Sequence, residues 1–351
     1  MSSSNSIASI IIIGAGGIVE TAHIPAYKKA GYTIQGITDI NIEKAQSLAL
    51  KSEIPVVYAS LQEAISASGE FTVFDIAVPA SGIIEIIRQL PDRAGVLIQK
   101  PMGENLQQAK EILDICRQKK IRAGVNFQLR YAPYILKAKE IIAKGLIGEI
   151  CDVEINVNVL TPWHLWDFLF NLPRMEILYH SIHYIDLVRS LLGNPFSVFA
   201  RTIKHPEMKE LASVRSVICM DYGEWLRANI LTNHGHAYGL KHQHSYVRIE
   251  GSKGAIYIKM GLSMDYPKGV PDELEYISFA EGESGEWQSV DFQGSWFPEA
   301  FIGSMGEILN AMENEQHHPD NSVEDCIQTM ACVEAAYMAD QQGGIAINQL
   351  F

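Results

Sequence analysis

The chain has 351 residues, of which 47% are hydrophobic and 20% are charged. This length fits two domains of ordinary size, and the composition is typical of a globular protein with a sizeable core. Because 41 Asp and Glu outnumber 28 Lys and Arg, the formal net charge is −13 at pH 7. That balance argues against a general affinity for nucleic acid or for an anionic membrane surface, so we expect neither as a partner.

The cysteines and the first residues favour a reduced, cytoplasmic protein. The cysteines form no C-x-x-C pair and are odd in number, as is typical of free thiols. The chain starts with a serine-rich, uncharged segment, and its apolar run Ile10–Ile13 stops at Gly14. A signal peptide needs a basic start and roughly 7–15 apolar residues, and a membrane span needs about 20, so the sequence predicts neither.

In the first part of the chain, short apolar runs alternate with longer amphipathic segments. This alternation predicts a parallel sheet covered by helices on both faces, as in a doubly wound α/β domain. The predicted strands are Ile7–Ile13, Thr33–Thr38, Thr72–Val78, Gly95–Ile98 and Ile121–Phe127. The predicted helices are Val19–Ala30, Ile42–Leu50, Ile83–Leu90 and Leu106–Lys119.

The second part of the chain is mostly a succession of strands. They predict an open, largely antiparallel sheet in an α+β domain, interrupted by a helix at about Glu176–Leu192 and followed by a C-terminal helical segment. We place the domains at 1–124 and 125–351, with the C-terminal segment free to pack back on the first. The predicted strands are Cys151–Leu160, Ser197–Ile203, Val214–Met220, Trp225–Thr232, Ser245–Glu250 and Ala255–Lys259.

A glycine-rich turn, Gly14–Val19, follows the first predicted strand and opens the first helix. Glycines at such a turn let the backbone approach a pyrophosphate at the helix N-terminus, and an acid ending the second strand, here Asp39, binds a ribose diol. Val19 stands where the third glycine of the fingerprint would be, and the alternative is a tight turn without a ligand. No Arg or Lys occurs in Ile40–Ile42, so we expect NAD rather than NADP. The expected cofactor contacts are Gly14, Gly16, Gly17, Ile18 and Asp39.

Three further segments carry a resemblance to a known family. Leu97–Pro101 resembles the E-K-P signature of the Gfo/Idh/MocA oxidoreductases, Tyr179–Asp186 resembles their second signature, and Gly14–Tyr27 resembles their opening motif. Smaller similarities occur at Gly145–Ile150 and Glu250–Gly254, so the resemblance covers nearly the whole chain. It implies an N-terminal Rossmann domain, a C-terminal open sheet that often mediates oligomerisation, and NAD(P)-linked oxidation of sugars or polyols.

The chain departs from the family pattern at several positions. Gln99 replaces the usual Glu, Tyr179 replaces an acid, Ser181 replaces a glycine, and Ile83 stands where many members carry a histidine after the turn at Pro79. The acid's role therefore does not transfer to Tyr179. The matching positions are Lys100, Pro101, His183 and Asp186. From the resemblance we add Pro79 and Lys100 to the expected cofactor contacts.

The predicted helix Glu176–Leu192 has two distinct faces. One is an apolar stripe for the core: Leu178, Ile182, Ile185 and Leu192. The other gathers Glu176, Tyr179, His180, His183 and Asp186. This polar face is either solvated or directed into a pocket. Because histidine and tyrosine are unusual on a plain surface, we favour a pocket for His183 and leave both possibilities open for His180.

Further substrate contacts are expected at the carboxyl edge of the parallel sheet, where ligands bind in such folds. Lys100 follows the strand Gly95–Ile98 and reaches that edge. Gln128 and Arg130 alternate with their neighbours after Asn126, so their side chains share one face. Both are candidate substrate contacts, although Arg130 fits a structural anchor equally well.

Aromatic and histidine clusters in the second part of the chain allow two interpretations each. Trp163, His164 and Trp166 are suited to packing on a sugar ring or to an oligomer interface. Four histidines suggest a metal cluster at first sight, but no cysteine or carboxylate completes the set at ligand spacing, and histidines two residues apart also arise on a sheet face. We therefore expect no metal. These histidines are His234, His236, His242 and His244.

The hypothesis that follows is an NAD-dependent dehydrogenase for a sugar, an inositol-like polyol or a related hydroxy compound. His183 accepts the hydroxyl proton, Lys100 stabilises the developing alkoxide, and Tyr179 hydrogen-bonds the same oxygen or tunes His183. Two alternatives stay open: a non-catalytic regulator that binds nucleotide or sugar, and a lyase or hydrolase that recycles NAD in place. We expect a homodimer or homotetramer assembled through the open sheet, whose outer face lacks covering helices.

Overall fold

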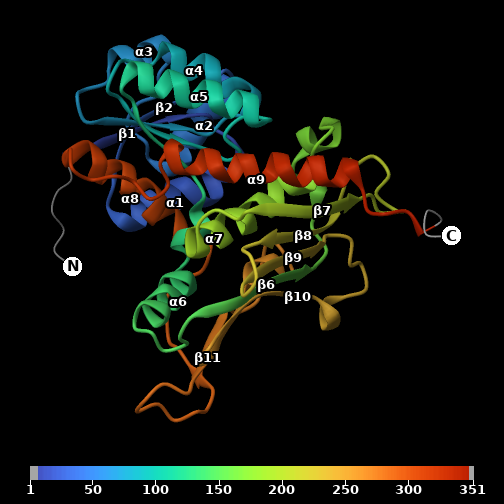
Figure 1. The fold of residues 1–351 in the computed structure, drawn as a ribbon. Helices are drawn as coiled ribbons and strands as arrows, with labels where there is room; N and C mark the ends of the chain where they lie inside the picture. The colour runs from blue at the N-terminus through green and yellow to red at the C-terminus, as the bar shows by residue number, and fades with distance from the viewer. Residues whose placement is uncertain (1–6, 348–351) are drawn as a thin grey trace. The chain divides into compact units, whose positions relative to one another are not determined.

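The fold is described by a computed structural model for residues 7–347. The chain divides into two compact units (Figure 1). The first comprises the residues up to Ala132 together with Trp296–Met330, and the second comprises Pro133–Ser295 together with the residues from Ala331 on. The first unit thus ends at Ala132, and a late segment, Trp296–Met330, returns to it.

The sheet of the first unit has five parallel strands in the order β2-β1-β3-β4-β5, which confirms the predicted Rossmann-like architecture. Its strands are mostly buried because helices cover both faces, and the isoleucines of β1 are buried. The strands are β1 (Ser9–Ile13), β2 (Thr33–Thr38), β3 (Thr72–Ile76), β4 (Gly95–Ile98) and β5 (Arg122–Val125). The helices are α1 (Ile24–Ala30), α2 (Ile42–Ser52), α3 (Leu61–Ser66), α4 (Ile83–Gln89), α5 (Leu106–Lys119) and α8 (Ala300–Glu313).

Helix α8 packs directly on β4 and β5, although nearly 200 residues of chain separate them. Two strand glycines make this approach possible. A Cβ on Gly95 would lie 2.8 Å from the Met312 side chain, and one on Gly124 would lie 2.6 Å from Ile308. Sequence periodicity does not reveal this contact, because the glycines and the helix are complementary only once folded.

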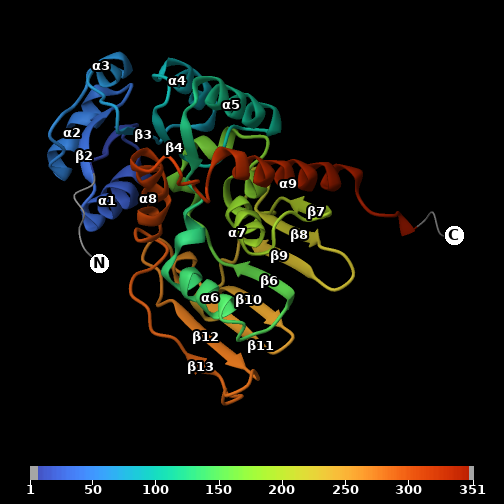
Figure 2. The same cartoon turned by 60° about the vertical axis from the view of Figure 1, so that its left-hand side comes forward.

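The second unit contains an eight-stranded sheet in the order β13-β12-β11-β10-β6-β9-β8-β7, as Figure 2 shows. Every neighbouring pair is antiparallel except β6 with β9, so the expected largely antiparallel sheet is confirmed. The strands are β6 (Ile150–Asn158), β7 (Ser197–Ile203), β8 (Arg215–Asp221), β9 (Arg227–Asn233), β10 (His244–Gly251), β11 (Gly254–Lys259), β12 (Glu273–Ser278) and β13 (Gln288–Ser289). The last two strands were not predicted.

The predicted helix at 176–192 begins as a π-helical turn, Glu176–Ser181, and continues as α7 (Ile182–Leu192). The residues Ile182–Arg189 of α7 are buried on all sides. His183 and Asp186 are therefore not solvated, whereas Tyr179 and His180 in the π-helical turn are half-buried. The remaining helices are α6 (Pro133–Ala143), which was not predicted, and α9 (Val323–Gln342), within which the division between the units falls.

The outer face of the eight-stranded sheet carries exposed apolar side chains on three neighbouring strands, among polar side chains such as Arg201, Arg215 and Arg227. Phe199 on β7, Val217 on β8 and Leu231 on β9 are 63%, 48% and 48% exposed, respectively.

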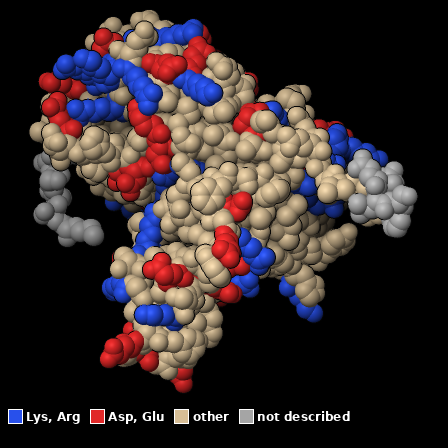
Figure 3. All heavy atoms as spheres, in the orientation of Figure 1, with Lys and Arg blue, Asp and Glu red and all other residues tan. Residues whose placement is uncertain are grey.

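On the face drawn in Figure 3, Lys and Arg are interspersed with Asp and Glu rather than gathered into a basic surface. None of the described helices is both long and apolar enough to cross a membrane.

Candidate active site

The glycine-rich turn lies at the carboxyl edge of the five-stranded sheet, between β1 and the first helix. Gly14 has a φ of +113°, and a Cβ there would lie only 2.4 Å from the carbonyl oxygen of Ala77. Gly16 and Gly17 are exposed, and a Cβ on either would meet nothing within 4 Å. The turn therefore has a strained, tightly packed start and an open end, which fits a pyrophosphate held by backbone N–H groups.

The first helix opens with a π-helical turn, Val19–His23, directly after Ile18. The Gly16 carbonyl accepts hydrogen bonds from the backbone N–H groups of Val19 at 3.0 Å and Glu20 at 3.2 Å. The first N–H groups of a helix have no acceptor within it, and such groups are suited to bind a phosphate.

Asp39 follows β2 and connects the end of this strand to the glycine turn after β1. Its Oδ2 accepts from the N–H of Ala15 at 2.7 Å, and its Oδ1 accepts from the N–H of Asn41 at 2.7 Å. The carboxylate therefore holds the glycine turn in place, and its remaining lone pairs fit a ribose diol. The next residue, Ile40, is an isoleucine whose side chain is fully exposed. It is an apolar surface suited to an adenine ring, and we identify it only from the structure.

Pro79 and Lys100 follow the next two strands at the same edge. Pro79 is exposed and begins the short 3₁₀ turn Ala80–Gly82 after β3. Lys100 lies just beyond β4, and burial lowers the pKa of its ammonium to about 8. The neighbouring Gln99 carries no charge that would oppose this effect, and its Oε1 accepts from Asn126 Nδ2 at 2.9 Å. Lys100 is thus mostly protonated at neutral pH and loses its proton as the pH rises through about 8.

A fully buried polar network lies beneath this edge. Asp75 Oδ2 on β3 is 2.7 Å from His23 Nδ1 and accepts from the Tyr27 hydroxyl at 2.8 Å. His23 Nε2 lies 3.5 Å from Asn126 Nδ2. A chain of polar contacts therefore runs from Asp75 to Gln99, beside Lys100. The signal for it in the sequence is an acid inside the otherwise apolar strand Thr72–Ile76, which we did not use.

Gln128 and Arg130 lie on the 3₁₀ turn Gln128–Tyr131 after β5, and both are buried. The Arg130 guanidinium donates to Asp325 Oδ2 and to the Asp320 carbonyl, both at 2.6 Å. These contacts favour the anchoring alternative for Arg130, since they tie the turn to the start of α9. Gln128 is 1% exposed, and its Oε1 accepts no hydrogen bond from the residues that the structure describes.

In the second unit, His183 lies in the first turn of α7 and is 6% exposed. Asp186 follows one turn later and is also buried. Tyr179 is partly exposed, and its ring meets Phe168 edge-on with centroids 5.7 Å apart. Glu176, His183 and Asp186 on the polar side of the helix thus lie within the protein, which fits a role in a site better than a role in solvation.

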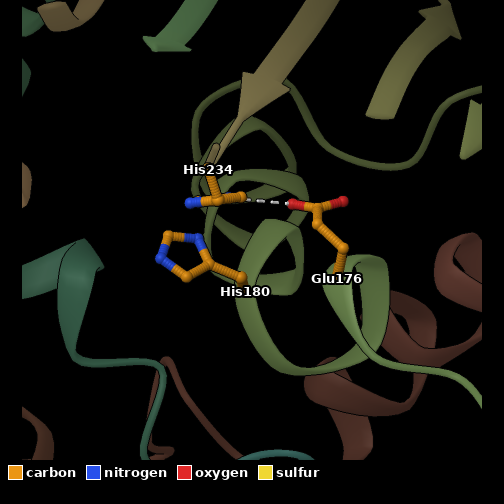
Figure 4. Close-up of side chains that lie close together, drawn as sticks. All are labelled: Glu176, His180 and His234. Atoms are coloured by element: carbon orange, nitrogen blue, oxygen red, sulfur yellow. Dashed lines mark hydrogen bonds and ion pairs between the residues drawn. The ribbon is translucent and has the colours of Figure 1, made fainter. Parts of the chain in front are cut away.

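Figure 4 shows three side chains that converge beside this helix: Glu176, His180 and His234. The Glu176 carboxylate is fully buried, and its Oε1 lies 3.3 Å from His234 Nε2. Burial alone would raise the pKa of Glu176, but hydrogen bonds and charge attraction from His234, with further hydrogen bonds from Ser181 and Ser216, hold it below its usual value. The carboxylate therefore stays ionised inside the unit.

The tryptophans of the loop after β6 lie close to these histidines. Trp163 is buried, and its ring is 5.3 Å from His234 and 6.1 Å from His180, measured between centroids. Trp163 also lines a pocket of about 430 Å³ with aromatic, hydroxyl and carboxylate groups. Trp166 lies against Tyr266, with centroids 5.7 Å apart, and Tyr266 lines the same pocket. The polar and aromatic lining includes Thr161, Trp163, His164, Glu207, Asp265 and Tyr266.

Comparison with known proteins identifies the family. The NAD-binding Rossmann-fold model of the Gfo/Idh/MocA oxidoreductases matches residues 8–127, and the model of their C-terminal alpha/beta domain matches residues 139–347. No curated protein sequence matches the chain.

Solved structures share the fold at low identity. An oxidoreductase from Agrobacterium radiobacter, in complex with NAD+, L-tartaric acid and magnesium, is 21% identical, with 98% of this chain and 99% of that chain covered and a TM-score of 0.78. Aldose-aldose oxidoreductase from Caulobacter crescentus, complexed with glycerol, is 14% identical, with 96% and 98% covered and a TM-score of 0.79. Levoglucosan dehydrogenase, in complex with NADH and levoglucosan, is 17% identical, with 95% and 97% covered and a TM-score of 0.79. The two family models together span most of the sequence, and the chain therefore belongs to the Gfo/Idh/MocA family of NAD-binding oxidoreductases.

Proposed function

We propose that the protein is an NAD-dependent dehydrogenase that oxidises a CH–OH group of a sugar, an inositol-like polyol or a related hydroxy compound. The observation that carries this proposal is the position of Lys100 at the carboxyl edge of the sheet of an NAD-binding domain. Burial lowers the pKa of this lysine to about 8. Such a cation is suited to stabilise an oxygen that becomes negative during oxidation. The similar structures were determined with tartaric acid, glycerol and levoglucosan, all of them hydroxylated compounds.

Two residues divide the proton chemistry in this proposal. His183 accepts the proton of the substrate hydroxyl, because a neutral imidazole is a suitable base near neutral pH. Lys100 stays protonated and stabilises the alkoxide oxygen until the carbonyl has formed. When bound, NAD supplies the acceptor for the hydride that leaves the carbon. Overall, the alcohol loses one hydride and one proton, and the carbonyl product, NADH and a proton result.

The remaining assignments concern binding. Tyr179 hydrogen-bonds the reacting oxygen or tunes His183. We assign the substrate to contacts with Gln128, His180, Trp163 and Trp166, and leave Arg130 as an anchor of its turn. The aromatic and carboxylate lining of the pocket at Trp163 supports the assignment of Trp163, since aromatic rings pack on the apolar faces of sugars and carboxylates accept from their hydroxyls.

We assign NAD rather than NADP because the Asp39 carboxylate would repel a 2′-phosphate. The same proposal places the enzyme in the cytoplasm as a homodimer or homotetramer. All five cysteines are free thiols, which supports a reducing compartment.

A cofactor-absorbance assay with a panel of sugars and polyols tests the function. Net formation of NADH with one of them supports the dehydrogenase. NADH or sugar binding without any turnover would instead support the non-catalytic regulator. Conversion of a substrate without net change in NADH, but with an absolute need for NAD, would support elimination or hydrolysis with the cofactor recycled in place.

A further inference from the structure

Glu176, His180 and His234 bring three metal-ligating groups together inside the second unit (Figure 4). Glu176 and His180 lie four residues apart in the π-helical turn, and His234 follows the end of β9. Their ligand atoms all lie within 4.8 Å of one another. We propose that these side chains bind one divalent transition-metal ion per chain, with Zn²⁺ as the preferred ion. This proposal does not rest on the dehydrogenase proposal, but where it holds, His180 binds the ion and is not a direct substrate contact.

The distance between two of the donors fits ligands of one ion. His234 Nε2 lies 3.3 Å from Glu176 Oε1. A direct hydrogen bond between an imidazole and a carboxylate is usually about 2.7–2.9 Å when charge-assisted. Two atoms bound to a tetrahedral zinc at about 2.0–2.1 Å are separated by roughly 3.3–3.4 Å. The observed separation is therefore long for the hydrogen bond and matches an edge of the tetrahedron.

The surrounding hydroxyl groups orient these donors. Thr161 Oγ1 lies 2.8 Å from His234 Nδ1, which directs the other ring nitrogen, Nε2, toward Glu176. Ser216 donates to Glu176 Oε2 and orients the carboxylate, whereas Ser181 and Thr232 donate to Oε1 at 2.6 Å and 3.0 Å, so an ion bound at Oε1 would displace one of these two hydroxyls. Metal-binding histidines and carboxylates are usually held in this way by partners behind them.

The charge of the cluster also calls for a cation. Glu176 is fully buried, and no Lys or Arg among the described residues forms an ion pair with it; its ion-pair partner is His234. A buried carboxylate is costly unless a positive charge compensates it. A divalent ion bound by one carboxylate and two neutral imidazoles supplies that charge. The competing explanation is a protonated histidine, and metal analysis separates the two.

The donor set selects the class of ion. Two imidazole nitrogens and one carboxylate oxygen suit Zn²⁺, whereas Mg²⁺ and Ca²⁺ prefer six or more oxygens. The same three ligands serve in catalytic zinc sites, which keep a fourth position for water or a ligand. Thr161 and Trp163, which contact His234, also line the pocket of about 430 Å³, so these two residues separate the cluster from the pocket.

The sequence argued against a metal because no carboxylate follows His234 at ligand spacing. The fold supplies a carboxylate from a distant segment, Glu176. Of the four histidines at 234–244, only His234 contacts it. His236 and His244 instead contact Asn158 and Asn156, at 3.2 Å and 3.0 Å. They provide matched controls for the experiment.

The test uses the purified full-length protein, stripped with a chelator and dialysed against Zn²⁺ or Co²⁺. We expect elemental analysis to find one ion per chain, and we expect bound Co²⁺ to show the intense visible absorption of a tetrahedral site. Glu176→Gln, His180→Asn and His234→Gln should each abolish stoichiometric binding. His236→Gln and His244→Gln should leave it unchanged. Thr161→Val should weaken binding by about 10–100-fold, the usual effect of removing an orienting partner.

Two outcomes would overturn the proposal. In the first, the folded wild-type protein takes up no ion and gives no tetrahedral Co²⁺ spectrum. In the second, the three ligand variants bind as much metal as the two controls, which would identify adventitious surface binding. If the Glu176 variant does not fold, metal binding by His180→Asn and the Co²⁺ spectrum of the wild type still test the proposal. None of these readouts depends on NADH, so failure of the metal site and failure of the dehydrogenase proposal are distinguishable.

Discussion

The carboxylate of Asp39 accepts a hydrogen bond from the backbone N–H of Ala15 at 2.7 Å, and so joins the end of β2 to the glycine turn after β1. One side chain therefore both shapes the glycine turn, which we propose to hold the pyrophosphate, and presents a negative charge where we propose that the ribose binds. This double role makes the nucleotide preference testable by substitution.

We expect the wild-type protein to bind NADH more tightly than NADPH. Asp39→Ser combined with Ile40→Arg should reverse the preference, because the change removes a repulsive charge and adds a partner for the 2′-phosphate. Asp39→Ala alone should weaken NADH binding about tenfold, as expected for one charged hydrogen bond. Fluorescence titration with both nucleotides measures these effects. Tighter binding of NADPH by the wild type would contradict this reading of Asp39.

The proposed base should act on chemistry and not on cofactor binding. His183→Ala should lower turnover by about 10²–10⁴-fold, the usual range for a positioned general base, with little change in NADH affinity. Lys100→Ala should have a similar effect, and Lys100→Arg should not restore full activity, since a planar guanidinium does not replace a compact ammonium. Steady-state kinetics and nucleotide titration on the same preparations separate the two contributions.

Tyr179→Phe serves as the control for this assignment. A large loss of turnover would place the tyrosine in the proton path and make His183 an orienting residue. If the His183→Ala variant oxidised the substrate as fast as the wild type from acid to alkaline pH, the assignment of His183 as the base would be ruled out.

The pH profile should reflect the lowered pKa of Lys100. Oxidation should fall on the acidic side as His183 becomes protonated, and it should fall above about pH 8 as Lys100 loses its charge. Gln99→Glu should shift the alkaline fall in rate to a pH about one unit higher, because a neighbouring carboxylate favours the ammonium form of Lys100. Gln99→Met, which adds no charge, should leave the pH of this fall unchanged. A rate that rises through pH 8 would instead make Lys100 the base.

Arg130 should prove to be an anchor. Its side chain is 4% exposed and that of its partner Asp325 is 40% exposed, so the pair is only partly screened by water. Arg130→Lys and Asp325→Asn should each lower the free energy of unfolding by about 1–2 kcal/mol, less than for a fully buried pair. Denaturant titration measures this loss. A raised KM in Arg130→Lys with unchanged stability would favour a substrate contact instead.

The apolar outer face of the eight-stranded sheet should mediate assembly. Phe199, Val217 and Leu231 expose large apolar side chains on neighbouring strands, which is unfavourable in water. We expect a dimer or tetramer by sedimentation, and Val217→Arg combined with Leu231→Glu should dissociate it without unfolding the subunit. Substitution of the exposed Leu50 on α2 by Glu is the matched control. A wild-type monomer at micromolar concentration would contradict the prediction.

Much of the local structure follows directly from the sequence. The segments Thr33–Thr38, Gly95–Ile98, Leu106–Lys119 and Ser197–Ile203 have the predicted bounds. Their periodicity and flanking turn residues are local properties, and the backbone responds to them locally. The placement of Gly14 and Asp39 at one sheet edge follows as well, because parallel strands all present their carboxyl ends at the same edge.

Tertiary structure alone decided which distant groups meet. The polar side of the helix at 176–192 was visible as a pattern, but the pattern could not show that the side is buried or that Glu176 meets His234 from the end of β9. Nor could it show that α8 fits over Gly95 and Gly124. Such contacts depend on strand order and on close packing between segments far apart in the chain. Hydrophobic periodicity specifies which face of an element is buried, but not which partner covers it.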